Sequence, residues 1–301
     1  GPWSGMTDAD PQRIACMVTL LEDLGERLNN GDLDALEAVT LAVEAMENEP
    51  LFNAGRGSVL DENGNVGMDA SIMRGVDKAA GSVIGLTTTR HPVRAAQHLL
   101  LEGWPVMLAG PPGDDFGKRH RVEQMERSWF ETELRKAQWE KWKAQRLRPG
   151  ATDEEDALLD HDGEQDGWGT VGAVALDVHG QVAAATSTGG MTGKPVGRVG
   201  DTAIIGAGTW ADQTIAVSCT GVGEAFIRTV AAHSVAVHHR TEGLEKAALK
   251  VLEEVEPLGG RGGLIAVNTD GEVVMPFQTM LMYRGVYADG TCQVGIRPDL
   301  I

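Results

Sequence analysis

The segment Gly169–Gly190 reads GTVGAVALDVHGQVAAATSTGG, and it decides how the rest of the chain is interpreted. Two apolar stretches, Val171–Val178 and Val182–Ser187, flank a His-Gly pair that favours a tight turn. The pattern predicts a β-hairpin with glycine and hydroxyl residues at its open end. Small polar residues at strand ends are within reach of a substrate, so this end is the first candidate site.

The segment just before this hairpin, Ala151–Trp168, has the opposite character. It holds eight acidic residues and no Lys or Arg, and glycines interrupt it. Such a composition cannot bury enough apolar surface to form a core element. We therefore expect a surface linker here, and residue 169 marks the sharpest change of composition in the chain.

The remaining elements occur in blocks of helices and blocks of strands. Blocks without strict alternation favour an α+β fold over a barrel or a dinucleotide-binding sheet. Apolar spacing predicts helices over Pro11–Asn29, Asp32–Met46, Val93–Leu101, Lys118–Arg148, Glu224–His239 and Leu244–Glu256, and strands over Val106–Ala109, Thr214–Cys219, Leu264–Asn268, Glu272–Phe277 and Met282–Tyr287.

The overall composition excludes several classes of function. The 301 residues carry 44 acidic and 26 basic side chains, a formal charge of −18, which would repel nucleic acid and anionic membranes. No apolar run is long enough for a membrane span, and the first residues lack a signal-peptide pattern, so we expect a cytoplasmic protein. Cys16, Cys219 and Cys292 form no close pair, which predicts free thiols.

The usual histidine and metal motifs are absent. The sequence contains no His-Glu-x-x-His, Cys-x-x-Cys or Gly-x-Ser-x-Gly. Glycine and hydroxyl residues instead cluster at Gly169–Gly172, Thr186–Gly190, Gly197–Asp201 and Thr220–Gly223. Catalysis by an N-terminal threonine needs neither histidine nor metal, because cleavage before Thr170 would free an α-amine whose usual pKa is close to neutral. That amine can act as the base for the hydroxyl of the same residue.

Two of these clusters, together with a motif nearer the N-terminus, resemble one family. Thr-Ser-Thr-Gly-Gly at Thr186–Gly190, Gly-Arg-Val-Gly-Asp at Gly197–Asp201 and Phe-Asn-Ala-Gly at Phe52–Gly55 are similar, in order, to the isoaspartyl peptidase/L-asparaginase family of plant-type asparaginases. The resemblance extends over nearly the whole chain. It implies a single Ntn-hydrolase domain over 1–301 with a four-layer αββα sandwich, self-cleavage into an α subunit (1–169) and a β subunit (170–301), and an (αβ)₂ assembly.

The resemblance also implies catalytic roles. The bond between Gly169 and Thr170 would be cut, and Thr170 would be the nucleophile of both self-cleavage and hydrolysis. Thr188 would hydrogen-bond the attacking hydroxyl, with Thr186 as a supporting neighbour. The oxyanion hole would be formed by Thr220 and Gly221, whose donors stabilise the charge of the tetrahedral intermediate.

Substrate anchoring is implied in the same way. Arg198 would hold the α-carboxylate through two parallel bonds, Asp201 would hold the α-ammonium, and Gly223 would help to hold the aspartyl group. No catalytic cofactor is implied, but a structural Na⁺ is. Its ligands would be backbone carbonyls of the loop Leu51–Leu60, namely those of Leu51, Phe52, Asn53, Ala54 and Arg56.

The sequence departs from the family at its start. Members begin with a short strand that ends in His-Gly-Gly-Ala-Gly, whereas this chain begins Gly1-Pro2-Trp3-Ser4-Gly5. We therefore expect the first strand to be missing, which would affect maturation and activity more than the fold.

Three functions are compatible with these features. The leading hypothesis is an autoprocessing amidohydrolase that releases L-aspartate from isoaspartyl dipeptides and L-asparagine, through a β-aspartyl ester on Thr170. The first alternative is an aspartylglucosaminidase-like glycoamidase, although such relatives tend to carry Asn-Gly where this chain has Gly189-Gly190. The second is a non-catalytic family member that is never cleaved.

Overall fold

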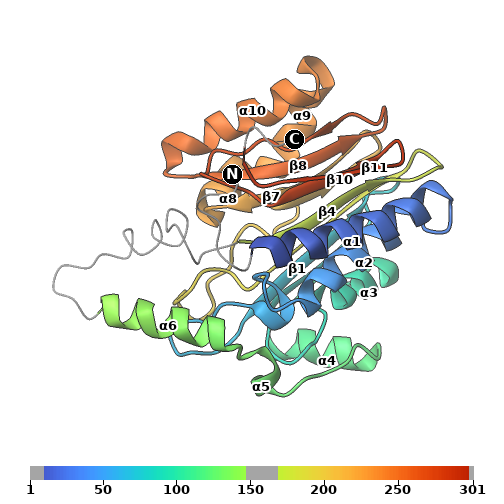
Figure 1. Cartoon of the computed structure of the whole chain (residues 1–301). Coiled ribbons are helices and arrows are strands. Elements are labelled where there is room, and N and C mark those ends of the chain that lie inside the picture. The colour runs from blue at the N-terminus through green and yellow to red at the C-terminus, as the bar shows by residue number, and fades with distance from the viewer. Residues whose placement is uncertain (1–9, 147–168, 298–301) are drawn as a thin grey trace.

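A computed structural model describes residues 10–146 and 169–297 of the chain (Figure 1). The predicted acidic linker and the predicted loss of a first strand both fall outside these residues. The helices are α1 (Asp10–Asn29), α2 (Ala35–Asn48), the short 3₁₀ helix η1 (Gly55–Gly57), α3 (Pro92–Glu102), α4 (Pro111–Arg119), α5 (Arg127–Phe130), α6 (Glu133–Arg146), α8 (Gly223–Thr229), α9 (Ala231–Glu242), α10 (Leu244–Val255) and η2 (Glu256–Leu258).

The strands form three sheets. Their bounds are β1 (Met68–Arg74), β2 (Ala80–Leu86), β3 (Met107–Ala109), β4 (Val171–Leu176), β5 (Val182–Thr188), β6 (Thr209–Ala211), β7 (Ile215–Gly221), β8 (Gly262–Asn268), β9 (Val273–Val274), β10 (Arg284–Ala288) and β11 (Thr291–Gly295). The first sheet has the order β3-β2-β1-β5-β4, the second β6-β7-β8-β9, and β10 pairs with β11. Only β2 and β3 are parallel; the other pairs are antiparallel.

Helices cover one face of each large sheet, and the opposite faces meet. On the first sheet α2 packs on β4 and β5, and α3 packs on β1 and β2. Strands β4 and β5 contact β7 of the second sheet, whose outer side carries α9 and α10 (Figure 1). The mixed helix and sheet fold expected from the sequence is therefore confirmed.

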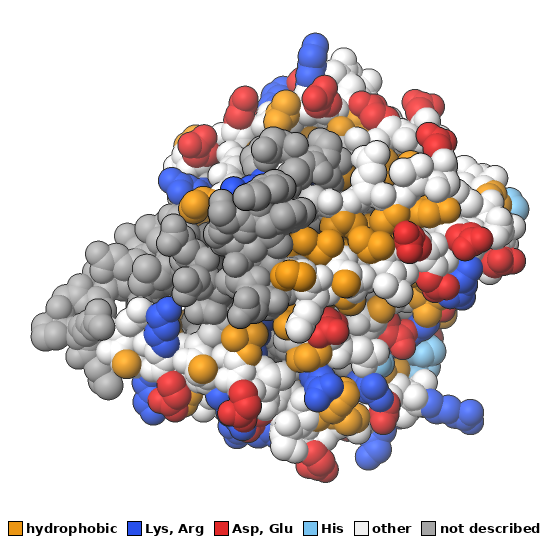
Figure 2. Space-filling model, viewed as in Figure 1, with side chains coloured by type: hydrophobic (Ala, Val, Ile, Leu, Met, Phe, Trp, Pro, Cys, Tyr) orange, Lys and Arg blue, Asp and Glu red, His pale blue; other side chains and the backbone are white. Residues whose placement is uncertain are grey.

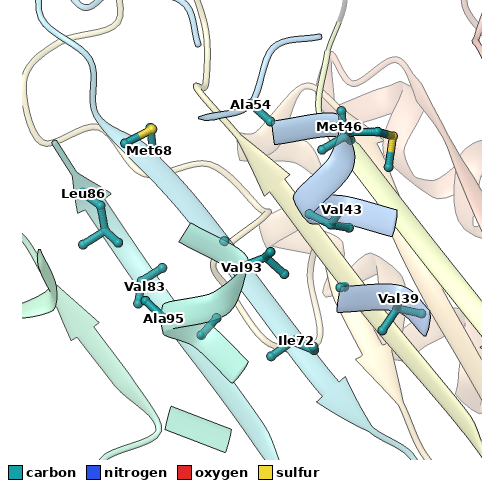
Figure 3. Close-up of a cluster of buried hydrophobic side chains, with 14 of the residues drawn as sticks. Val39, Val43, Met46, Ala54, Met68, Ile72, Val83, Leu86, Val93 and Ala95 are labelled. Atoms are coloured by element: carbon teal, nitrogen blue, oxygen red, sulfur yellow. The ribbon is translucent and has the colours of Figure 1, made fainter. Parts of the chain in front are cut away.

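The larger apolar core lies between the first sheet and its helices. Figure 3 shows aliphatic side chains of α2 beside β4 and β5, and those of α3 beside β1 and β2. The fully buried members drawn there include Val39, Val43, Ile72, Val83, Val93 and Ala95. Alanine and β-branched residues allow helix and sheet to approach closely, so this face of the sheet is rigid.

The gap between the two sheets is lined by smaller side chains. Its apolar members are Met73, Ala80, Val182, Ala184, Ala211, Ala216 and Val267. Four of these seven residues are alanine, two from each sheet, so the sheets can approach more closely than large side chains would allow. The candidate site lies at the edge of this gap.

The hairpin β4–β5 confirms the prediction from Gly169–Gly190 and is anchored at its turn. The carboxylate of Asp177 accepts hydrogen bonds from the backbone of His179 and Gln181, which closes the turn. Its other oxygen accepts from the Ala35 backbone at 3.1 Å, at the first residue of α2. One side chain thus fixes the hairpin relative to the helix that covers it.

A small hairpin, β10–β11, packs on α1. The contact is close because glycines face bulky partners: Tyr287 lies against Gly25, and Leu21 lies against Gly285. Figure 2 shows hydrophobic side chains gathered across the middle of this face, where α1 and the hairpin lie.

Two helix predictions are wrong in their extent. Lys118–Arg148 was predicted as one helix, but α4 ends at Arg119 and α6 begins only at Glu133, with the short α5 between them. Glu224–His239 is divided into α8 and α9 at Val230, which adopts a left-handed conformation (φ 49°). In residues 10–146 and 169–297 no helix has the length and apolar character to cross a membrane.

Candidate active site

One small pocket contains most of the residues predicted to act. It has a volume of about 30 Å³ and lies where β4 begins and where β5 and β7 end. Its lining residues are Gly169, Thr170, Thr188, Gly190, Met191, Arg198, Gly200, Asp201, Thr202, Thr220 and Gly221. A space of this size holds a water molecule but not an aspartyl group. A substrate must therefore displace lining side chains on entry.

The nucleophile predicted at Thr170 lies directly before β4. Strands β4 and β5 pair with Val171 opposite Ser187, so the next position outward places Thr170 beside Thr188. Thr188 is buried, and its hydroxyl accepts a hydrogen bond from the Gly190 backbone at 3.0 Å. The hairpin register therefore brings the two threonines together, as expected from the resemblance.

The predicted oxyanion residues approach from the second sheet. Thr220 and Gly221 are the last two residues of β7, which is longer than the predicted Thr214–Cys219 strand. A methyl group on Gly169 would lie only 2.9 Å from Thr220 Oγ1. The hydroxyl of Thr220 thus lies against the residue before the predicted cleavage bond.

Arg198 is engaged by a carboxylate on the protein itself. Its Nε and one terminal nitrogen donate to the two oxygens of Glu224, at 2.9 Å and 2.8 Å. This is the paired geometry that a substrate α-carboxylate would need. Glu224 is 56% exposed whereas Arg198 is 14% exposed, so the Glu224 side chain is the partner with room to move away.

Asp201 is a buried carboxylate with a free acceptor. Its side chain is 3% exposed, and Oδ2 has no hydrogen-bond partner among the described residues. Burial raises the pKa of Asp201 to about 7, although the positive charge of Arg198 opposes the shift. An unpartnered buried carboxylate oxygen is costly, and a ligand ammonium would satisfy it.

Gly223 allows the binding loop to approach the oxyanion strand. A methyl group at this position would lie 3.0 Å from a terminal nitrogen of Arg198 and from the Asp201 backbone nitrogen. A larger residue would push the two anchoring residues away from β7. Gly223 therefore acts through backbone proximity and is not itself among the residues that line the pocket.

The loop predicted to bind sodium is clamped to the same site. Asn53 donates from its side-chain amide to the Gly190 carbonyl at 2.7 Å and accepts from the Val59 backbone at 3.0 Å. The Asn53 carbonyl accepts from the Gly189 backbone at 3.0 Å. The loop is thereby joined to the Thr-Ser-Thr-Gly-Gly motif.

The carbonyls predicted to hold Na⁺ are partly engaged by protein donors. Those of Leu51 and Ala54 accept from the Arg13 side chain at 3.2 Å and the Gly57 backbone at 3.1 Å. Each carbonyl oxygen keeps a second lone pair, and neutral oxygens suit a hard cation. The loop chemistry fits Na⁺, while no cluster of three or more His, Cys, Asp or Glu in the described part of the chain could hold a metal.

Sequence reasoning missed two buried charges behind the pocket. Asp69 on β1 accepts from the Gly85 backbone at 2.8 Å, and Lys194 donates to the Gly67 carbonyl at 2.5 Å. Burial raises the pKa of Asp69, which the charge of Lys194 partly offsets, and burial lowers the pKa of Lys194. A lone Asp inside the apolar stretch Met68–Met73 is the signal that could have found this pair.

Comparison with known proteins defines the family. The family model described as asparaginase matches residues 8–296. The isoaspartyl peptidase of Escherichia coli (strain K12) is 41% identical over 288 residues, covering 93% of this chain and 87% of the relative. The isoaspartyl peptidase/L-asparaginase of Homo sapiens is 39% identical over 269 residues, covering 88% and 83%. The chain belongs to the asparaginase family, which confirms the resemblance found in the sequence.

Proposed function

We propose that this chain is a self-cleaving threonine amidohydrolase that releases L-aspartate from isoaspartyl dipeptides and L-asparagine. The observation that carries the proposal is the pocket that gathers Thr170, Thr188, Arg198, Asp201 and Thr220 from distant segments. The relatives named isoaspartyl peptidase and L-asparaginase support the same activity.

The proposed reaction follows from the roles these groups can take. After cleavage, the Thr170 hydroxyl attacks the side-chain carbonyl of the substrate, and the Thr170 α-amine accepts its proton. Thr220 and Gly221 stabilise the resulting oxyanion. Collapse expels ammonia or an amino-acid amine, which takes the proton, and leaves a β-aspartyl ester on Thr170. Water hydrolyses this ester and frees L-aspartate.

Substrate selection follows from the two anchors. Arg198 would exchange the carboxylate of Glu224 for that of the substrate, and Asp201 would accept the α-ammonium. A zwitterionic aspartyl group satisfies both, whereas a substrate without one of these charges would leave a partner unpaired. The leaving group lies outside this pair of contacts, so both amides and isopeptides can be accepted.

We also propose the subunit organisation implied by the family. Residues 1–169 and 170–301 would form the α and β subunits of one domain, and the helices on the outer faces of two apposed sheets support an αββα sandwich. An (αβ)₂ assembly is supported by an exposed apolar patch around the edge strand β3, formed by Leu101, Trp104, Val106 and Met107. Backbone carbonyls of the loop Leu51–Leu60 would hold the structural Na⁺. The cytoplasmic location stays a prediction from the sequence.

The test is self-cleavage together with turnover. Cleavage before Thr170 would split the 32.0 kDa chain into pieces of about 18 and about 14 kDa, visible by intact mass and denaturing gel. Thr170→Ala should abolish both cleavage and hydrolysis of β-aspartyl-leucine. Thr241→Ala, at an exposed threonine of α9, is the matched control and should retain both.

Two results would contradict the proposal. Hydrolysis that persists unchanged in Thr170→Ala would exclude Thr170 as the nucleophile. A preference for N-acetylglucosaminyl-asparagine over β-aspartyl-leucine would assign the glycoamidase activity instead.

A further inference from the structure

Four buried hydroxyl groups form a continuous chain between the two large sheets. Ser71 Oγ lies 2.7 Å from Thr209 Oγ1, which lies 2.5 Å from Thr186 Oγ1, which lies 2.8 Å from Ser218 Oγ. All four side chains are at most 3% exposed. The buried apolar residues around them are mainly alanine and valine. Ser82, which pairs with Ser71, adds a further buried hydroxyl, but it donates to the Ala203 carbonyl and not to the chain.

Successive members of the hydroxyl chain belong to opposite sheets. Ser71 (β1) and Thr186 (β5) come from the first sheet, and Thr209 (β6) and Ser218 (β7) come from the second. Each of the three contacts therefore crosses the gap between the sheets. Hydrogen bonds fix a separation within a few tenths of an ångström, which apolar contacts alone do not.

One arrangement of protons satisfies the whole chain. Ser71 also lies 2.5 Å from the Thr202 carbonyl, which can only accept. Ser71 also donates to Thr209, so its proton is shared with the Thr202 carbonyl, beside Asp201. Thr209 can then donate to Thr186, and Thr186 can donate to Ser218 or to the Gly208 carbonyl at 3.3 Å. Loss of Thr186 would leave Ser218 without its partner in the chain, and loss of any other member would remove one contact from each neighbour, which is costly in a dry interior.

On β5 and on β7, a member of the hydroxyl chain precedes a residue of the candidate site on the same face of the strand. Thr186 precedes Thr188 by two residues, and Ser218 precedes Thr220 by two residues. Because side chains alternate along a strand, each pair points to the same face of its sheet. The hydroxyl chain therefore controls where Thr188 and Thr220 lie relative to each other.

The nucleophile is tied to the same layer. Gly172, two residues after Thr170, pairs with Thr186 in the register of β4 and β5. A methyl group on Gly172 would clash with Ser218 Oγ, so the Ser218 hydroxyl rests directly on the β4 backbone. The start of β4 is thus held between Thr186 and Ser218.

We propose that Ser71, Thr209, Thr186 and Ser218 are positioning residues, which fix the distance between the nucleophile on the first sheet and the oxyanion donors on the second. The proposal rests on the proposed function, because it assigns the hydroxyl chain to the reaction of Thr170. These side chains do not line the pocket, so they act through Thr170, Thr188 and Thr220 and not on the substrate.

The decisive variants remove a hydroxyl and keep the shape. Thr186→Val and Thr209→Val should each lower kcat for β-aspartyl-leucine by about 10- to 100-fold and slow self-cleavage, because small displacements of reacting groups cost rates of this order. KM should change by less than about twofold, since both substrate anchors are intact. Thr186→Ser and Thr209→Ser, which keep the hydroxyl, should restore most of kcat.

The matched control is Thr40→Val. Thr40 is fully buried in α2, and its hydroxyl donates to the Leu36 carbonyl at 2.7 Å, outside the hydroxyl chain. This variant should lose stability to a similar degree and keep kcat. If Thr186→Val fails to fold, Ser71→Ala at the far end of the chain tests the same point with a smaller change of packing.

A double variant separates positioning from simple destabilisation. Once the hydroxyl chain is broken, a second break should lower kcat little further. The kcat of Thr186→Val/Thr209→Val should therefore be close to that of the less active single variant. The positioning role is overturned if kcat is unchanged in both single variants, or if the effects of the two substitutions on the activation free energy are fully additive. In either case, activity of the wild type still supports the proposed function. If wild type neither cleaves itself nor hydrolyses β-aspartyl-leucine, the proposed function fails, and the positioning role fails with it.

Discussion

If Asp201 holds the substrate ammonium as proposed, ligand binding depends on pH within the physiological range. The pKa of Asp201 is raised to about 7 because the carboxylate is buried. Below that pH the side chain is protonated in the free enzyme and cannot attract an ammonium group; above it the carboxylate is charged. The same shift means that the folded state loses stability as the pH rises through about 7, because the native protein holds this proton more tightly than the unfolded chain.

We predict that L-aspartate, the proposed product, binds more weakly as the pH falls below about 7. Each pH unit below the pKa should raise its inhibition constant by up to about tenfold. Inhibition constants measured between about pH 5 and about pH 9 test this dependence. Succinate, which lacks the α-ammonium, is the control and should not show the same loss; an equal loss for both ligands would exclude Asp201 as the ammonium anchor.

Under the proposed function, Glu224 would compete with the substrate for Arg198. Replacing it in Glu224→Gln removes a partly exposed ion pair, which is worth up to about 1 kcal/mol, so KM should fall by up to about fivefold. The change in kcat should be small. Steady-state kinetics with L-asparagine measure both constants. Glu245→Gln, at an acidic residue of the neighbouring helix α10, should leave KM unchanged, and a rise of KM in Glu224→Gln would show that the pair supports binding instead.

At the scale of single elements, the break between α8 and α9 stores strain. Val230 is a β-branched residue in the left-handed region, which costs about 1 kcal/mol or more for a non-glycine residue. Its side chain is exposed, so little packing compensates.

We predict that Val230→Gly raises the free energy of unfolding by about 0.5 to 1 kcal/mol, while Val237→Gly, at an exposed position inside α9, lowers it by about 1 kcal/mol. Urea unfolding of both variants in a Thr170→Ala background, which keeps a single chain, measures the difference. Destabilisation by Val230→Gly would mean that this side chain packs more than its exposure indicates.

The elements that the sequence predicted well are those with unbroken periodicity. The β4–β5 hairpin and helices α1, α3 and α10 lie close to their predicted ranges because their apolar spacing continues to both ends. The helix predicted over Lys118–Arg148 failed because charged residues give a weak apolar face, and periodicity does not reveal the loop before α5. The strand β11 was missed because it is only five residues long and Cys292 and Val294 are its only large apolar residues.

The site divides in a similar way. Motif residues such as Arg198 and Asp201 were found because they adjoin one another in sequence. The hydroxyl chain was not predicted as a unit, since Ser71, Thr209 and Ser218 are ordinary strand residues until the two sheets are packed together. The partnership of Arg198 with Glu224 likewise depends on tertiary packing, because 26 residues separate them.

For the whole molecule, the exposed patch around β3 is the surface through which the proposed assembly would form. Trp104 is 82% exposed and lies beside Leu101, Val106 and Met107 at an open sheet edge. We predict that Trp104→Glu reduces the assembly from twice the 32.0 kDa chain mass to that mass, as measured by light scattering coupled to size exclusion. Leu249→Glu, at an exposed apolar residue of α10, is the control. A variant Trp104→Glu that stays at the larger mass would place the interface elsewhere.

The order of the first sheet, β3-β2-β1-β5-β4, has a further consequence once the chain is cut. Strands β1 to β3 belong to the piece before residue 170, and β4 and β5 belong to the piece after it, yet β1 and β5 pair along six residues at the middle of the sheet. Neither fragment alone holds all the strands of this sheet. Scission therefore raises the kinetic order of folding from one to two, because chain connectivity no longer brings β1 to β5. The uncut chain would refold by itself, whereas each piece of the cut chain would have to meet the other, so the proposed cleavage would also make the fold hard to regain after denaturation.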